Sequence, residues 1–159
     1  MAIDAITAGF TGMTSPVATD AVATLTATAV TTLAGSPTDA TRVEFELLYA
    51  PLTTASGQDA QKEVIARSSD VSASPTGNYS TTFAAGLFAN PGLYQVQAKG
   101  VVGTGSPEVL SNMEVGRSSE LLVTEAGPQT LDDVKTQLNT NTAAIADHED
   151  RITTLEAAP

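Results

Sequence analysis

The chain lacks cysteine and tryptophan entirely, and its 159 residues include only four phenylalanines and three tyrosines. Without cysteine it can form neither disulfide bonds nor thiolate metal sites. Long apolar runs are missing too, so no segment is expected to span a bilayer. The N-terminal residues Met-Ala-Ile-Asp lack the basic segment and the apolar run of a secretory signal. We therefore expect the protein to be made in the cytoplasm of the cell that produces it.

Basic residues are also scarce. Seven lysines and arginines face eighteen aspartates and glutamates, which gives a formal net charge of −11 and a pI near 4.2. A surface of this charge repels phosphate groups. The composition therefore argues against nucleic acid and anionic membranes as partners.

Few side chains could carry out catalysis. The only histidine, His148, lies inside a helical repeat, where a packing role is expected. The run Asp147-His148-Glu149-Asp150 would point in four directions from a helix, which is typical of a solvated face rather than a metal site. No Ser-His-Asp or paired-carboxylate arrangement can be assembled by spacing. The sequence thus predicts no enzyme activity, no cofactor and no metal site.

What the sequence does contain is short segments in which apolar and polar residues alternate. In the clearest segment, residues 42–49, one face holds apolar side chains and the other holds charged ones: Val43, Phe45 and Leu47 against Arg42, Glu44 and Glu46. The predicted strands are residues 3–11, 21–30, 42–49, 63–68, 78–84 and 94–102, then 109–115 and 119–124 with an interruption near Gly116. Turn signals at intervals of roughly 8–12 residues are typical of an antiparallel sandwich.

This pattern predicts a mainly β protein with a C-terminal helix. The inward face should include Leu25, Val43, Phe45, Phe83, Tyr94 and Val96. We expect an N-terminal arm or edge strand in residues 1–14, a sandwich in residues 15–126, and a linker with a helix in residues 127–159. Gly127-Pro128 marks the boundary, and Thr130 is the expected N-cap of the helix.

Two of the predicted strands have distinctive sequences. Residues 23–29 read Ala-Thr-Leu-Thr-Ala-Thr-Ala, and residues 90–98 read Asn-Pro-Gly-Leu-Tyr-Gln-Val-Gln-Ala. They resemble the second and the penultimate strands of immunoglobulin-like domains in bacterial surface proteins and phage virions. The resemblance implies an immunoglobulin-like antiparallel β-sandwich in which Tyr94 forms the tyrosine corner, its hydroxyl bonded to upstream backbone. The alternative is that Tyr94 is a cross-strand packing residue.

The C-terminal segment contains a heptad repeat. One stripe recurs at alternating spacings of three and four residues: Leu131, Val134, Leu138, Asn141, Ile145, His148, Ile152 and Leu155. A mean spacing of 3.5 residues is typical of a coiled coil rather than of a helix packed on its own domain. Positions a are Leu131, Leu138, Ile145 and Ile152, and positions d are Val134, Asn141, His148 and Leu155. Residues 139–142 have poor helix propensity, so association must stabilise the helix.

Two short motifs in the repeat indicate how many chains associate. Residues 151–156, Arg-Ile-Thr-Thr-Leu-Glu, are similar to a motif of trimeric coiled coils in which the arginine pairs with a glutamate of the next chain, here Arg151 with Glu156. Residues 138–142, Leu-Asn-Thr-Asn-Thr, resemble layers of trimeric phage fibres and trimeric autotransporter adhesins. That resemblance implies that three copies of Asn141 form an anion-binding layer on the axis. The alternatives to a homotrimer are a dimer and a monomeric helix folded back on the sandwich.

An immunoglobulin-like sandwich followed by a short trimeric coiled coil resembles virion accessory proteins. The resemblance implies a non-enzymatic structural protein on the virion surface, namely a trimeric capsid decoration protein or head fibre of a tailed bacterial or archaeal virus. Its expected partners are copies of itself and the major capsid protein or other virion proteins, with host-surface glycans as a further candidate. The alternatives are a tail-fibre or baseplate adaptor and a cell-surface adhesin module.

Overall fold

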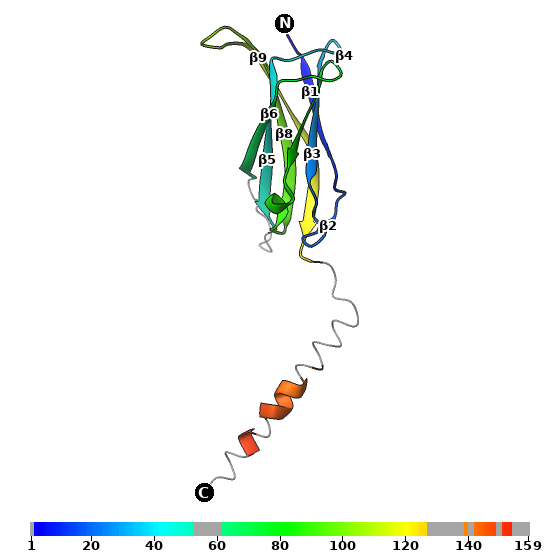
Figure 1. The fold of residues 1–159 in the computed structure, drawn as a ribbon, viewed down its shortest axis with the longest axis vertical. Helices are drawn as coiled ribbons and strands as arrows, with labels where there is room; N and C mark the ends of the chain where they lie inside the picture. The colour runs from blue at the N-terminus through cyan, green and yellow to red at the C-terminus, as the bar shows by residue number, and fades with distance from the viewer. Residues whose placement is uncertain (1, 53–61, 127–138, 140–141, 149–150, 154–159) are drawn as a thin grey trace. The chain divides into compact units, whose positions relative to one another are not determined.

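The computed structural model describes residues 2–52, 62–126, 139, 142–148 and 151–153. The chain divides into two compact units, residues 1–126 and 127–159. The first unit holds all of the described strands, and the second holds the described α-helical residues (Figure 1). The protein is therefore mainly β, with a short C-terminal helix.

The first unit contains nine described strands and one 3-10 helix. In chain order these are β1 (Ala5–Thr11), β2 (Val17–Ala18), β3 (Leu25–Leu33), β4 (Ser36–Pro37), β5 (Arg42–Pro51), β6 (Glu63–Asp70), β7 (Asn78–Phe83), η1 (Ala85–Phe88), β8 (Gly92–Thr104) and β9 (Val109–Thr124). The longer strands correspond to the segments that alternate in the sequence. The two-residue strands β2 and β4 lie where the sequence predicts none.

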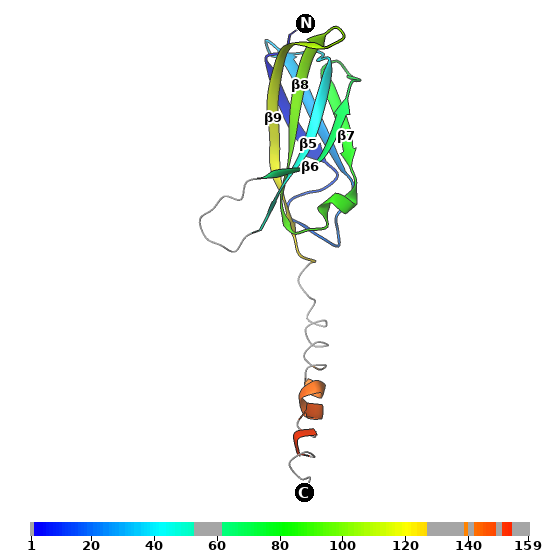
Figure 2. The same ribbon diagram turned by 90° about the vertical axis from the view of Figure 1, so that its left-hand side faces the viewer.

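The strands form two sheets that face each other (Figures 1 and 2). In the four-stranded sheet, β3 pairs with β1, β4 and β7, always antiparallel. The five-stranded sheet has the order β2-β9-β8-β5-β6. Its pairs are antiparallel except for the short parallel contact of β2 with β9. The N-terminal segment therefore contributes one strand to each sheet, and β1 lies at an edge of the smaller one.

The core lies between the two sheets. In β3, alternation turns Leu25, Ala27 and Ala29 inward, and the polar residues between them stay partly exposed. The six side chains predicted to face inward are all buried: Leu25, Val43, Phe45, Phe83, Tyr94 and Val96. The inward faces inferred from the sequence are thus confirmed.

The last strand differs from the prediction. β9 runs without interruption for 16 residues, whereas the sequence predicts a break near Gly116. Gly116 pairs with Ala98 in the ladder, so it continues the strand. A Cβ at this position would clash with the backbone oxygen of Ile6 in β1. Glycine is present because another backbone approaches closely, and not because the strand ends.

A second glycine, Gly77, ties the start of β7 to the connection between β3 and β5. Its N–H donates to Asp39 Oδ1 (2.6 Å), and its carbonyl accepts from the N–H of Thr31 (2.8 Å). Its φ is +75°, and a Cβ here would lie 2.7 Å from the Thr31 carbonyl oxygen and 2.9 Å from the Thr38 nitrogen. Both the backbone conformation and the lack of space therefore require glycine.

Gly77→Ala should destabilise the protein by about 1–3 kcal/mol more than Gly35→Ala, because backbone atoms must move to admit the methyl group. Gly35 is a matched control, since its φ is +77° and nothing lies within 4 Å of an added Cβ. Its substitution should cost only the left-handed strain of about 1–2 kcal/mol. Urea unfolding of both variants measures the difference. Equal costs would show that the space around Gly77 is not restrictive.

The second unit supplies the helix. Residues 142–148 are helical, as are residues 139 and 151–153 (Figure 1). Among the described residues, no helix is long and apolar enough to cross a membrane.

Candidate functional site

The first candidate site is the heptad stripe of the second unit. Of the residues predicted to hold three chains together, the structure describes Ile145, His148, Arg151 and Ile152, and all four are exposed. Ile145 and Ile152, one heptad apart, are 59% and 55% exposed. The other predicted residues lie outside the described part of the chain: Leu131, Val134, Leu138, Asn141, Leu155 and Glu156. The anion layer proposed at Asn141 and the pairing of Arg151 with Glu156 therefore remain predictions.

Tyr94, singled out from the sequence, stands at the start of β8 with its ring in the core. Its hydroxyl donates to the backbone carbonyl of Asn90, four residues upstream, at 2.8 Å. The ring packs against Tyr49 and Phe88, with centroids 4.9 Å apart in both pairs. Burial raises the pKa of the Tyr94 hydroxyl. This residue joins the turn before β8 to the core, so its role here is structural.

The second candidate site is the outer face of the five-stranded sheet. In the described part of the first unit, every basic residue lies on this face or pairs across it: Arg42, Lys62, Arg67, Lys99 and Arg117. Lys62, just before β6, forms an ion pair with Glu120 of β9. Arg42 pairs with both Glu44 and Glu108. The few positive charges in the described part of the first unit are thus gathered on one surface.

Four side chains cross this face in direct register, and we call them the polar row. Arg67 of β6 lies opposite Glu46 of β5, Glu46 lies opposite Gln97 of β8, and Gln97 lies opposite Arg117 of β9. Hydrogen bonds join them in that order. Arg67 Nε donates to Glu46 Oε1 (3.2 Å), Gln97 Nε2 to Glu46 Oε2 (2.8 Å), and Arg117 Nε to Gln97 Oε1 (2.8 Å). The row therefore links four strands through their side chains.

Glu46 is the most buried member of the polar row, being only 7% exposed. Lys99 Nζ lies 2.9 Å from its Oε2, so two cations and one amide surround the carboxylate. Burial raises the pKa of Glu46, but the hydrogen bonds from Lys99, Arg67 and Gln97 outweigh it, and the pKa lies below its ordinary value. Glu46 is therefore ionised at neutral pH and holds the neighbouring cations in place.

Glu46→Ala should destabilise the protein by about 1–3 kcal/mol, because Gln97 and Lys99 would lose their partner in a largely buried place. Glu44→Ala is the control on the same strand and face. Its carboxylate is more exposed and pairs with Arg42, so the change should cost less than about 1 kcal/mol. Urea unfolding at neutral pH measures both. Equal costs would contradict the role assigned to Glu46.

The lowered pKa of Glu46 also predicts how stability depends on pH. Its contribution is full above the unfolded value, about 4.3, and is lost as the pH falls through the folded value. Between about pH 5 and pH 3, wild type should therefore lose more stability than Glu46→Gln, which cannot titrate at this position. Thermal unfolding across that range tests the sign, and parallel losses in the two proteins would contradict it.

A hollow of about 380 Å³ opens beside the polar row, over β5 and β6. Its lining consists of Arg42, Glu44, Phe45, Glu46, Arg67, Ser68 and Ser69. Because charged and hydroxyl groups dominate the lining, the hollow suits a polar side chain better than an apolar ligand. Within the described ranges, no group of three or more His, Asp or Glu side chains could hold a metal ion.

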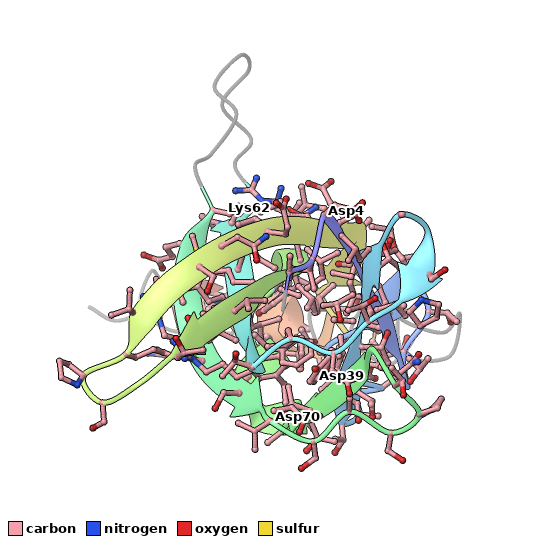
Figure 3. All side chains as sticks on the ribbon, turned by 90° about the horizontal axis from the view of Figure 1, so that it is seen from above. Asp4, Asp39, Lys62 and Asp70 are labelled. Carbon is pink, nitrogen blue, oxygen red and sulfur yellow. The ribbon has the colours of Figure 1, made fainter. Side chains whose placement is uncertain are left out.

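Aspartates elsewhere on the first unit bind backbone groups. Asp4 Oδ2 accepts from the N–H of Ala34 (2.7 Å), and Asp70 Oδ2 accepts from the N–H of Ser80 (3.0 Å). Figure 3 labels these two residues and Asp39, which binds a backbone N–H in the same way. Their charges therefore face neutral donors rather than cations, and these parts of the surface remain acidic.

The polar row is absent from the sequence-based predictions. Alternation in residues 42–49 puts Glu46 on the outer face, but the neighbours of Glu46 depend on strand register. Gln97 and Arg117 come from strands more than fifty positions further along the chain. The available signal was the Arg-x-Glu-x-Glu spacing of residues 42–46, which marks one face as charged.

No protein-family model matches the sequence, and no curated protein matches it.

Proposed function

We propose that this chain is a non-enzymatic structural protein of a virion surface, a homotrimer that serves as a capsid decoration protein or head fibre of a tailed virus. Its first unit would be an immunoglobulin-like domain, and its second unit a trimeric coiled coil. The major capsid protein or another virion protein would be its partner.

The observation that carries the proposal is the exposure of Ile145 and Ile152. Both lie on described helical residues, one heptad apart, with more than half of each side chain accessible. Burying an isoleucine side chain contributes about 1.5–3 kcal/mol, so an apolar stripe left in water favours association. Three chains meeting along this stripe would bury both residues in every copy.

The strand arrangement supports the immunoglobulin-like part of the proposal. The sheet containing β1, β3 and β7 faces the sheet containing β9, β8, β5 and β6, and neighbouring strands are antiparallel throughout these two sets. The hydroxyl of Tyr94 bonds to backbone upstream at the start of β8. Both features are found in immunoglobulin-like sandwiches. Such domains serve many functions, so the exposed heptad stripe supports the proposal more strongly than the fold does.

The location on the virion can be tested directly. We expect an antibody raised against residues 1–126 to label the heads of purified particles at many sites, because decoration proteins and head fibres are repeated over the capsid. Mass spectrometry of the same particles should find the chain in many copies. Labelling confined to the tail tip would support an adaptor instead, and unlabelled particles would contradict the proposal.

A further inference from the structure

The first half of β9 carries an exposed apolar strip. Leu110, Met113 and Val115 are each at least half exposed, and they lie opposite Gly103, Val101 and Lys99, alternate residues of β8, so they share the outer face; we call these three residues the β9 strip. The ladder places Met113 opposite Val101 of β8, which is buried, so the strip adjoins a buried apolar side chain. Exposed apolar groups gathered in this way mark an interaction site more often than scattered ones do.

Positive charge adjoins the β9 strip. Arg117 follows it on the same face of the strand, and Lys99 lies opposite Val115. Lys99 shares the carboxylate of Glu46 with Arg67. Among the described residues, Arg117 makes no ion pair, and its bond to Gln97 uses only Nε. Two cations thus share one carboxylate, and a third, Arg117, lies beside them next to an apolar strip, a composition typical of protein interfaces, where Met and Arg are enriched.

The rest of the first unit has the opposite charge. Acidic residues that form no ion pair within the described part of the chain include Asp4, Asp20, Asp39, Asp70, Glu114 and Glu125. The described basic residues of this unit are all on the outer face of the five-stranded sheet or paired across it. Two copies that meet by any other surface would therefore bring carboxylates together, which is unfavourable.

We propose that the β9 strip and Arg117 dock onto the acidic surface of a second copy of this chain. The proposal rests on the trimer of the proposed function, which brings three first units together. A contact between unlike surfaces is heterologous, and three such contacts can close a ring. Tethering through the C-terminal segment would raise the effective concentration of the first units around one another to about the millimolar range. A small interface would therefore be enough to hold them together.

The chemistry of the face favours a protein partner over a glycan. All seven aromatic residues of the chain are buried or half-buried, and each belongs to the core or packs against it. The face therefore lacks an exposed aromatic ring on which a sugar could stack, whereas exposed valine, leucine and methionine side chains suit contact with another protein.

Amide hydrogen exchange of the full chain tests the contact, with sedimentation to establish the number of chains. We expect the peptide covering residues 109–117 to exchange at least about tenfold more slowly in the wild-type trimer than in the double variant Ile145→Asp/Ile152→Asp. Arg117→Glu and, separately, Met113→Asp should remove most of that protection while the protein stays trimeric. Val71→Asp is the matched control, since Val71 is an exposed apolar residue outside β9, and it should leave the protection unchanged.

The outcomes separate this inference from the proposed function. If the wild type is a trimer but its β9 peptide exchanges as fast as in the double variant, the docking contact is overturned. The proposed coiled coil would not be contradicted by that result. If residues 109–117 are protected only in assembled particles, another virion protein covers this face. That result would overturn the proposal that a second copy of the chain binds there. A wild-type protein that sediments as a monomer overturns both.

Discussion

Aspartate at both Ile145 and Ile152 should leave the protein monomeric at micromolar concentration. Each isoleucine buried in a coiled-coil seam contributes about 1.5–3 kcal/mol to the stability of the trimer. In a trimer, Ile145 and Ile152 each form a layer of three side chains, and the double variant would lose the contributions of both layers. The new carboxylates would also meet around the axis at close range, where their repulsion is strong. Sedimentation equilibrium of the full chain should show a trimer for wild type and a monomer for this variant.

The control for this prediction adds the same charge to the outer helix surface. Ala143 and Ala146 lie on described helical residues but occupy positions f and b of the heptad. Ala143→Asp/Ala146→Asp should therefore remain trimeric. If wild type is monomeric, the heptad stripe does not assemble the protein. If both double variants dissociate, added negative charge and not the stripe controls assembly.

Phe45→Ala should lower the free energy of unfolding by about 3–5 kcal/mol, because it removes a large buried side chain and leaves a cavity. Phe45 lies in the middle of β5, is fully buried, and belongs to the core that both sheets share. The pairing of β5 with both β6 and β8 limits how far the backbone can move to fill the space. Urea unfolding followed by circular dichroism measures the loss.

Thr28→Ala provides the comparison for Phe45. Thr28 points outward from β3, is half-buried, and should cost less than about 1 kcal/mol when shortened. A loss below about 1 kcal/mol for Phe45→Ala would mean that the space between the sheets is not the principal core. Because Phe45 was assigned to the inward face from alternation alone, this result would also contradict that assignment.

The strands were the most predictable part of the fold. In β3 and in the first half of β5, apolar residues recur at every second position, and the structure turns those residues inward. Alternation alone does not predict that Leu48 is buried as well as Leu47, and it does not indicate that the pairing of β5 with β6 shifts register between these two residues. A bulge depends on how two strands fit together, so a period-two pattern within one strand cannot indicate it.

The sequence by itself determined the mainly β character, most of the strand positions, the inward-facing residues and the heptad spacing, because each of these follows from local periodicity. Only the tertiary structure decided that β9 continues through Gly116. This glycine is needed because the backbone of β1, about a hundred residues earlier in the chain, approaches it closely, so it does not mark the end of a strand. The tertiary structure likewise decided that Glu46, Gln97 and Arg117 form one row. Contacts between distant segments depend on sheet order and register, which local sequence patterns do not encode.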